Sequence, residues 1–129
     1  MEKNAGIILQ ESPYSVKATI DRLAAFLEAH DAEIYARIDQ QAELEKVGLS
    51  IQPLEFILFG SPKAGGPIMM ENVIAALDLP LKIIAWENEQ KKILIAYNEA
   101  RYIEERHGLT HNASSPLNLG GLIAAALKE

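Results

Sequence analysis

The chain has 129 residues, a formal charge of −6 at pH 7 and no cysteine. This length is typical of one domain, which we place at residues 1–129 and which buries roughly two-thirds of its unfolded surface. The missing cysteine excludes disulfides, thiolate metal ligands and cysteine nucleophiles. The acidic balance and scattered lysines and arginines argue against a nucleic-acid partner, because phosphate neutralisation needs clustered cations.

Membrane and export signals are missing from the sequence as given. No apolar run approaches the roughly 20 residues that span a bilayer. The first residues, MEKNAG, lack the apolar region of a signal peptide. We therefore expect a soluble, cytoplasmic protein with no membrane contact.

The first half of the chain predicts two strands and two helices. Residues 5–10 (AGIILQ) form a short β-like run, and Ser15 then caps a helix with apolar residues at i, i+3 and i+4 spacing. Residues 33–39 alternate apolar and polar side chains, which indicates a half-exposed strand. A short helix over 40–47 follows, and Gly48 stands where a left-handed residue ends a helix.

The middle of the chain predicts three more strands. Leu54–Phe59 is strongly apolar and fits a central strand. Met69–Leu77 predicts a short helix that stops before Pro80. Leu81–Trp86 and Lys92–Tyr97, joined by a polar loop, form a β-hairpin.

Two helices complete the chain. Asn98 is expected to cap the helix Ala100–His107, with Gly108 at its end. Leu117–Leu127 is a last apolar helix. Five strands with a hairpin, and helices that do not strictly alternate with them, predict an α+β fold.

Four segments together resemble the family known as domain of unknown function 302. They are ARID, FGSPKAGGPIM, DLPLKIIAWE and YNEARYIEERHGL, which begin at Ala36, Phe59, Asp78 and Tyr97. The resemblance implies a curved antiparallel sheet of about five strands with helices packed on one side, of the TATA-binding-protein-like β-α-β(4)-α type. It also implies a homodimer, and it transfers no activity.

The chain departs from that family at several positions. Gln40 stands where similar members usually carry a histidine, and Ser61 stands where asparagine is usual. If that histidine supports an activity elsewhere in the family, this chain should lack it.

The segment from Ser61 to Pro67 is a candidate site for an anion. Glycines allow backbone N–H groups to approach a ligand, and a helix N-terminus adds about half a positive charge. Lys63, Gly65 and Gly66 would contact the acidic end of a ligand, with Lys82 as a further cation. The phosphate-loop pattern is missing, however, so a structural turn before a helix is the simpler interpretation.

Tyr97 and His107 are candidates for an acid–base cluster near a strand end and the following helix. His107 comes just before Gly108, however, and a cation there is also explained by the helix dipole. The histidines and carboxylates show no metal-ligand spacing, so we expect neither a metal nor a cofactor.

The large apolar residues leave two interpretations open. A curved sheet covered by helices encloses a pocket for an apolar molecule, with adaptable methionine walls. An apolar sheet face that stays uncovered would instead form a dimer interface. The residues concerned are Phe56, Phe59, Met69, Met70 and Trp86.

These observations favour a non-enzymatic homodimer that binds a small acidic or apolar ligand between sheet and helices. The expected ligand-binding residues are Lys63, Gly65, Gly66, Lys82, Tyr97 and His107. The alternative is an enzyme of unknown reaction type that uses Lys63, Tyr97 and His107. A third possibility is a structural interaction module without a ligand.

Overall fold

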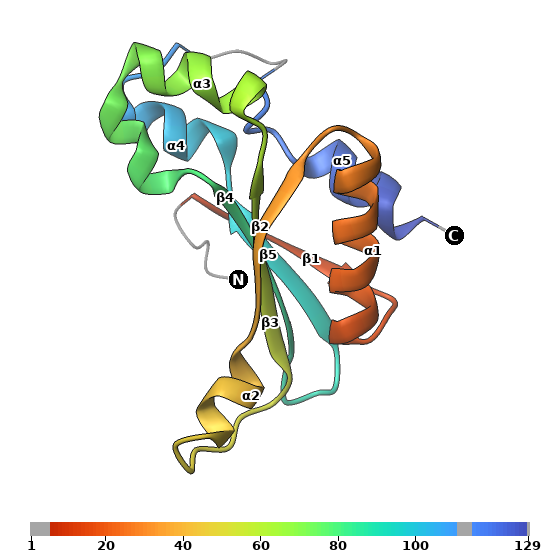
Figure 1. Ribbon diagram of the computed structural model, residues 1–129. Helices are drawn as coiled ribbons and strands as arrows, with labels where there is room; N and C mark the ends of the chain where they lie inside the picture. Colours follow the sequence, from red (N-terminus) through yellow and green to blue (C-terminus); the bar gives the residue numbers. More distant parts are fainter. Residues whose placement is uncertain (1–5, 111–114, 129) are drawn as a thin grey trace.

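Five antiparallel strands form one twisted sheet in the computed structural model, which describes residues 6–110 and 115–128 (Figure 1). The strand order across the sheet is β1-β5-β4-β3-β2. The strands are β1 (Ile7–Ser12), β2 (Glu33–Asp39), β3 (Leu54–Gly60), β4 (Leu81–Glu87) and β5 (Ile93–Asn98). The expected α+β class and the antiparallel sheet are therefore confirmed.

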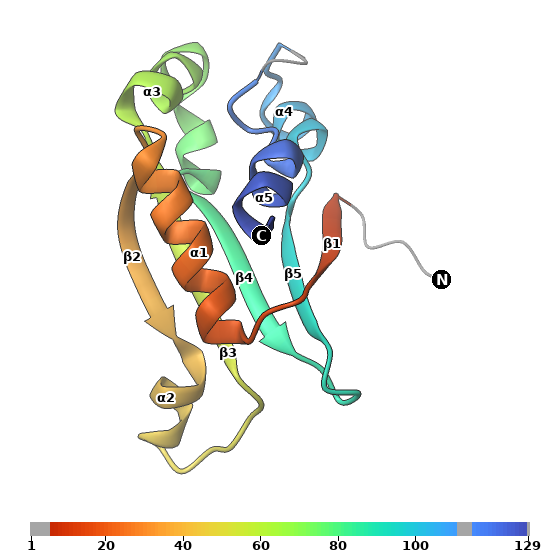
Figure 2. The same cartoon turned by 90° about the vertical axis from the view of Figure 1, so that its right-hand side faces the viewer.

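Two helices cover one face of the sheet. They are α1 (Val16–Ala29) and α5 (Gly120–Leu127), which lie side by side in Figure 1 and Figure 2. The remaining helices lie beyond the ends of the strands. The short α2 (Gln40–Glu45) lies at one end, and the other end holds α3 (Pro62–Glu71), the 3₁₀ helix η1 (Val73–Asp78) and α4 (Ala100–His107).

The main core fills the space between the sheet and these two helices. The apolar stripe of α1 is buried, with Ile20 and Leu23 completely inaccessible to solvent. It packs against the inner side chains of three neighbouring strands and against buried side chains of α5. Each such aliphatic side chain contributes about 1.5–3 kcal/mol when fully buried. The central members are Ile57, Ile83, Ile95 and Ile123.

A second, smaller core packs together α3, η1 and α4 at their end of the sheet. Ala75 of η1, Ile103 of α4, Leu109 and Leu117 are buried together, with Ile68 of α3 packed against them. This cluster fixes α3 next to the end of β3, where the chain leaves the sheet.

Several local predictions are confirmed. The Ser15 side chain accepts a hydrogen bond from the backbone N–H of Ala18 at 3.1 Å, and Asp39 does the same for Ala42 at 2.9 Å. Gly48 and Gly108 have positive φ angles of 81° and 64°, which glycine adopts without steric cost. Strand β2 has the predicted bounds, and the first residue of the first predicted strand, Ala5, lies outside the described residues.

Two helix starts and one capping residue were predicted wrongly. Helix α3 begins at Pro62 rather than Met69, because proline fits the first helical position, where its missing N–H costs nothing. Glu99, not Asn98, precedes α4, since Asn98 is the last residue of β5. Helix α5 begins at Gly120 rather than Leu117.

The second face of the sheet is apolar but carries no helix over its middle among the described elements (Figure 1, Figure 2). Antiparallel sheets with one solvated face normally alternate apolar and polar residues. Here the register places Glu11, Lys82 and Asn98 on the second face together with a continuous set of apolar residues. Its apolar members are Ile7, Leu9, Ala36, Ile38, Leu54, Phe56, Leu58, Ile84, Trp86, Leu94 and Ala96.

Candidate functional site

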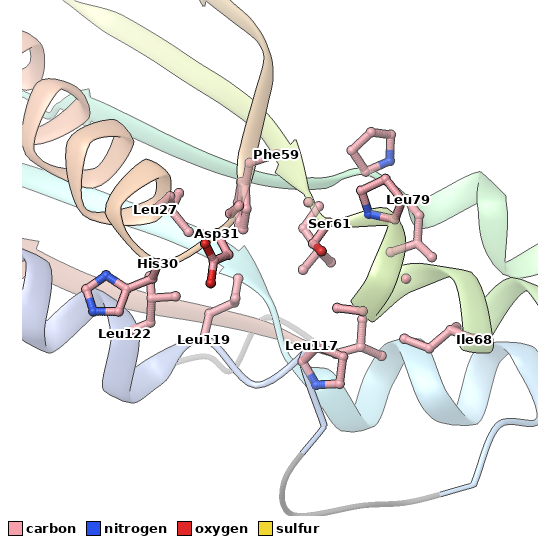
Figure 3. Close-up of a pocket in the computed structure, with 18 of the residues that line it drawn as sticks. Leu27, His30, Asp31, Phe59, Ser61, Ile68, Leu79, Leu117, Leu119 and Leu122 are labelled. Atoms are coloured by element: carbon pink, nitrogen blue, oxygen red, sulfur yellow. The ribbon is translucent and has the colours of Figure 1, made fainter.

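A pocket of about 510 Å³ opens where the end of α1, the end of β3 and the segment before α5 meet (Figure 3). The sheet register explains the meeting point. Glu33 pairs with Gly60, so the turn that leads from α1 into β2 lies beside the turn that leads from β3 into α3. The volume lies within the range of about 300–1,000 Å³ that small-molecule sites occupy.

The pocket is lined mainly by apolar side chains. Phe59 of β3 and Leu27 of α1 come from the main core, while Ile68 and Leu79 come from the smaller core. The pocket therefore lies between the two cores, and its walls are held by both. The remaining apolar lining residues are Ala32, Tyr35, Pro62, Ala64, Met69, Pro80, Leu81, Pro116, Leu117, Leu119 and Leu122.

Two of the polar lining residues, His30 and Asp31, lie toward one end of the pocket. Figure 3 shows His30 and Asp31 near Leu119 and Leu122, whereas Ile68 and Leu79 lie at the opposite end. The φ angle of Asp31 is +68°, a left-handed conformation that few residues other than glycine, asparagine and aspartate adopt. This conformation directs the chain from the end of α1 into β2.

The hydrogen bonds of these polar groups leave capacity for a ligand. His30 Nδ1 lies 2.8 Å from the backbone oxygen of Phe26, and its ring stacks on the Phe26 ring at 4.1 Å. A carbonyl only accepts, so Nδ1 donates and Nε2 keeps its lone pair in the neutral ring. Ser61 precedes α3 without making a capping hydrogen bond, and Asn118 also lines the pocket.

A second, smaller pocket of about 360 Å³ lies next to the first. Lys82 and Asn98 of the second sheet face line it, together with Leu58, Leu77 and Asp78. Its other lining residues also line the larger pocket, so the two pockets share a wall. That wall contains Leu79, Pro80, Leu81 and Leu119, and the Leu79–Pro80 peptide bond is cis.

Comparison with known families decides the classification of the chain. The family model described as "Domain of unknown function DUF302" matches residues 8–124. The chain belongs to the DUF302 family. The resemblance of the four sequence segments is therefore confirmed.

Named relatives of this DUF302 chain are longer proteins. "Fluoride-specific ion channel FluC 1" of Brucella suis biovar 1 is 33% identical over 106 residues, which cover 82% of this chain and 42% of that protein. The protein of the same name from Brucella abortus biovar 1 is 33% identical over 82% of this chain and 39% of its own length. The chain thus spans about two-fifths of these relatives. No described helix of this chain has the length and apolar character needed to cross a bilayer.

A solved structure confirms the DUF302 fold. The crystal structure of an uncharacterized conserved DUF302 protein from Bacillus stearothermophilus superposes with a TM-score of 0.77. The alignment covers 96% of this chain and 97% of the other, at 16% sequence identity. At that identity the similarity concerns the fold alone.

The structure separates the predicted residues of the Ser61–Pro67 segment. Gly65 lines the larger pocket, and a side chain added there would touch Met69 Cε and Leu79 Cδ1 at 3.9 and 4.0 Å. Gly66 has no neighbouring atoms within 4 Å of the same position, and Lys63 is exposed outside the lining of both pockets. The segment is the first turn and a half of α3 rather than a turn before a helix.

The other predicted ligand residues lie apart from these. Lys82 lines the smaller pocket, with its ammonium 4.5 Å from the centre of the Phe56 ring. Tyr97 is buried in the main core, and burial raises the pKa of its phenol. His107 is buried at the end of α4, where Nε2 lies 2.6 Å from Asp78 Oδ2. The ligand-binding roles of these residues stay predictions.

The enzyme alternative gains no support from this arrangement. Among the described residues, no hydrogen bond joins Lys63, Tyr97 and His107, which belong to the α3 surface, the main core and the η1–α4 contact respectively. Within the same described ranges, no group of three or more histidines, aspartates or glutamates is placed to hold a metal ion.

The residues that sequence reasoning missed are those of the turn after α1. In the sequence, His30 is one of three histidines without metal-ligand spacing, and no motif singles out Asp31. The only indication in the sequence is their position before a strand. The turn before β2 and the turn after β3 meet because these antiparallel strands pair, so both turns lie at the same end of the strands. Gln40, where family members similar to this one usually carry histidine, begins α2 at the opposite end of the sheet (Figure 1).

Proposed function

We propose that this DUF302 chain binds a small, mainly apolar molecule in the larger pocket, as a non-enzymatic module in the cytoplasm. The observation that carries this function is the pocket itself, which has a volume of about 510 Å³, is walled by two apolar cores and contains a few polar side chains. This combination is the usual form of a small-molecule site. The cysteine-free sequence is compatible with a reducing compartment.

The test combines native mass spectrometry with a matched pair of variants. The protein as purified is measured without added ligand, and a reproducible extra mass identifies a bound molecule. Gly65→Leu places a side chain in the pocket, whereas Gly66→Leu places the same side chain in open space on the same helix. We expect the extra mass to disappear only with Gly65→Leu. Retention of the bound molecule by Gly65→Leu would remove the pocket as its site.

We further propose that two copies associate through the apolar second face of the sheet. Five strands of six or seven residues span roughly 20 Å by 20 Å at the usual rise and spacing. That is about 400 Å² of flat surface per copy, half of what a standard interface buries on each partner. In Figure 1, α2 with the loop that follows it and η1 lie on the side of the sheet away from α1. These segments contain the exposed apolar residues Val47, Leu49, Ile74 and Leu77, which would enlarge the interface.

A second copy suits this face better than an anionic membrane surface. The chain carries a formal charge of −6, which opposes attraction to anionic lipids. Interfaces of homodimers are also more apolar than ordinary protein surfaces.

The dimer is tested by light scattering after size-exclusion chromatography. Leu9 is 38% exposed on β1, so Leu9→Glu should fold and yet yield a monomer. Met70→Glu, at an 88% exposed position of α3, is the control and should stay dimeric. The single tryptophan, Trp86, lies on the same sheet face, so its emission should shift on dilution to monomer. A monomer at all concentrations would end the proposal.

A second candidate function is that of an interaction module beside a membrane protein. It rests on the Brucella relatives named fluoride-specific ion channels, in which a segment similar to this chain belongs to a longer polypeptide. The test expresses the part of the Brucella suis protein outside the matched 106 residues in detergent. Binding of this chain at micromolar concentration would support the candidate, and its absence would remove it.

A further inference from the structure

The charges around the larger pocket indicate which chemical class of ligand it takes, on the assumption that it is a ligand site as proposed above. Among its described lining residues there is neither lysine nor arginine. The one carboxylate is Asp31, and Lys63, the cation expected at an acidic ligand, does not line the pocket. We propose that the pocket binds an apolar amine, with its ammonium group at Asp31 and its apolar body toward Ile68 and Leu79.

The Asp31 carboxylate is available for such a ligand. No hydrogen bond or ion pair within the described part of the chain engages its side chain. By contrast, Asp21, Asp39 and Asp78 each accept a hydrogen bond from the protein. Asp31 is also held at one place by a left-handed backbone between α1 and β2.

Helix dipoles act on the pocket with opposite signs, and their magnitudes decide the outcome. Helix α3 begins at the pocket and supplies about half a positive charge, which by itself favours an anion. Helix α1 ends at the pocket and supplies about half a negative charge. Helix α5 also begins at the pocket, just after Leu119, so the three helix ends together leave about half a positive charge. The full negative charge of Asp31 is larger and determines the preference. The overall charge of −6 also raises the local concentration of cations.

Aromatic rings support the same ligand class. Tyr35 and Phe59 line the pocket together with Asp31, and aromatic faces attract ammonium groups. His30 Nε2, with its lone pair, is an acceptor that an N–H donor satisfies. An acid would meet no described cation in this lining.

The test uses three probes that differ only in their polar group: octylamine, octanol and octanoate at pH 7. Alkylamines are protonated there, since an ordinary primary amine has a pKa of about 10. Dissociation constants are measured by isothermal titration calorimetry for the full chain. We expect octylamine to bind about three- to fivefold more tightly than octanol, which is the range of an ion pair that keeps contact with water. Octanoate should bind most weakly.

Two variants assign the preference to Asp31. Asp31→Asn keeps the left-handed conformation, which asparagine adopts readily. This variant should bind octylamine and octanol with equal dissociation constants, and the value for octanol should be that of the wild type. Glu28→Gln removes the same charge from an exposed position of α1 outside the pocket, and should keep the preference.

Each outcome separates the two levels of the proposal. The amine inference is overturned if octanoate binds as tightly as octylamine or more tightly, or if Asp31→Asn still prefers octylamine to octanol. Either result leaves a ligand pocket. If none of the three probes binds and the purified protein carries no adduct, the proposed small-molecule function fails as well.

Discussion

His107 Nε2 and Asp78 Oδ2 lie 2.6 Å apart, and this contact joins the end of α4 to the end of η1. Arg106 donates to the same carboxylate from the solvent side, at 3.2 and 3.3 Å. Asn72 adds a hydrogen bond from Nδ2 to the His107 carbonyl at 2.7 Å. Because Asp78 directly precedes the Leu79–Leu81 wall, this polar contact positions the segment that both pockets share.

Asp78→Ala should therefore destabilise the fold by about 1–3 kcal/mol, the cost of leaving a buried polar group without its partner. The His107 side chain is only 3% exposed, so water does not replace the lost acceptor. Arg106→Ala removes the exposed partner of the same carboxylate and should cost less than about 1 kcal/mol. Urea denaturation of both variants measures the difference, and equal losses would contradict the ranking.

Asp21 should make the stability of the protein depend on pH in the acid range. Arg37 Nη1 donates to Asp21 Oδ1 at 2.6 Å, and this hydrogen bond lowers the pKa of Asp21 below its ordinary 3.8. A lowered pKa in the folded state means that the unfolded chain binds the proton more tightly. The contribution is therefore fully present above about pH 4 and is lost as the pH falls through the folded pKa.

The measurement is the urea midpoint as a function of pH from 7 to 2.5. Asp21→Asn should lower stability at pH 7 and flatten the acid limb of the curve. Lys17 also lies 3.7 Å from Asp21 but is highly exposed, so Lys17→Gln should change little. An unaltered acid limb in Asp21→Asn would show that the contact with Arg37 does not persist in solution.

Tyr97 should give the opposite dependence at alkaline pH. Burial raises the pKa of its phenol, so the unfolded chain loses this proton at a lower pH than the folded chain. The resulting stability is present below about pH 10 and is lost as the pH rises through the folded pKa. The test compares the free energy of unfolding of the wild type and of Tyr97→Phe at pH 8 and pH 11. Only the wild type should lose the contribution of Tyr97 at the higher pH. The exposed Tyr35 gives the control, Tyr35→Phe, in which the alkaline loss should remain.

Local sequence signals predicted most elements of the fold because they do not depend on distant contacts. Alternation fixed the bounds of Glu33–Asp39, and a side-chain cap and a terminal glycine marked α1 and α4. The start of α3 was missed because Pro62, Gly65 and Gly66 suggest a turn when taken alone. In the structure, Ile68 packs against the smaller core, and this tertiary contact outweighs the weak helix propensity of glycine.

The pocket could be predicted only in part. The segment from Ser61 to Pro67 was a candidate ligand site in the sequence, with a structural turn as the simpler interpretation, and its residues Ser61 and Gly65 do line the pocket. His30 and Asp31 were missed because their role depends on the pairing of β2 with β3, which the sequence does not state. The segment before α5 joins the same pocket from more than 50 residues farther along the chain than Ser61.

Lys63 provides the last prediction, because it distinguishes an acidic ligand from an apolar amine. The side chain is exposed on α3 and forms no ion pair within the described residues. Lys63→Ala should therefore change the free energy of unfolding by less than about 0.5 kcal/mol, as for an ordinary surface site. It should also leave the binding of octanoate unchanged, since Lys63 does not line the pocket. A loss of several kcal/mol would show that the lysine is structural. A selective loss of octanoate binding would instead show that the acidic group of a ligand contacts Lys63 on α3.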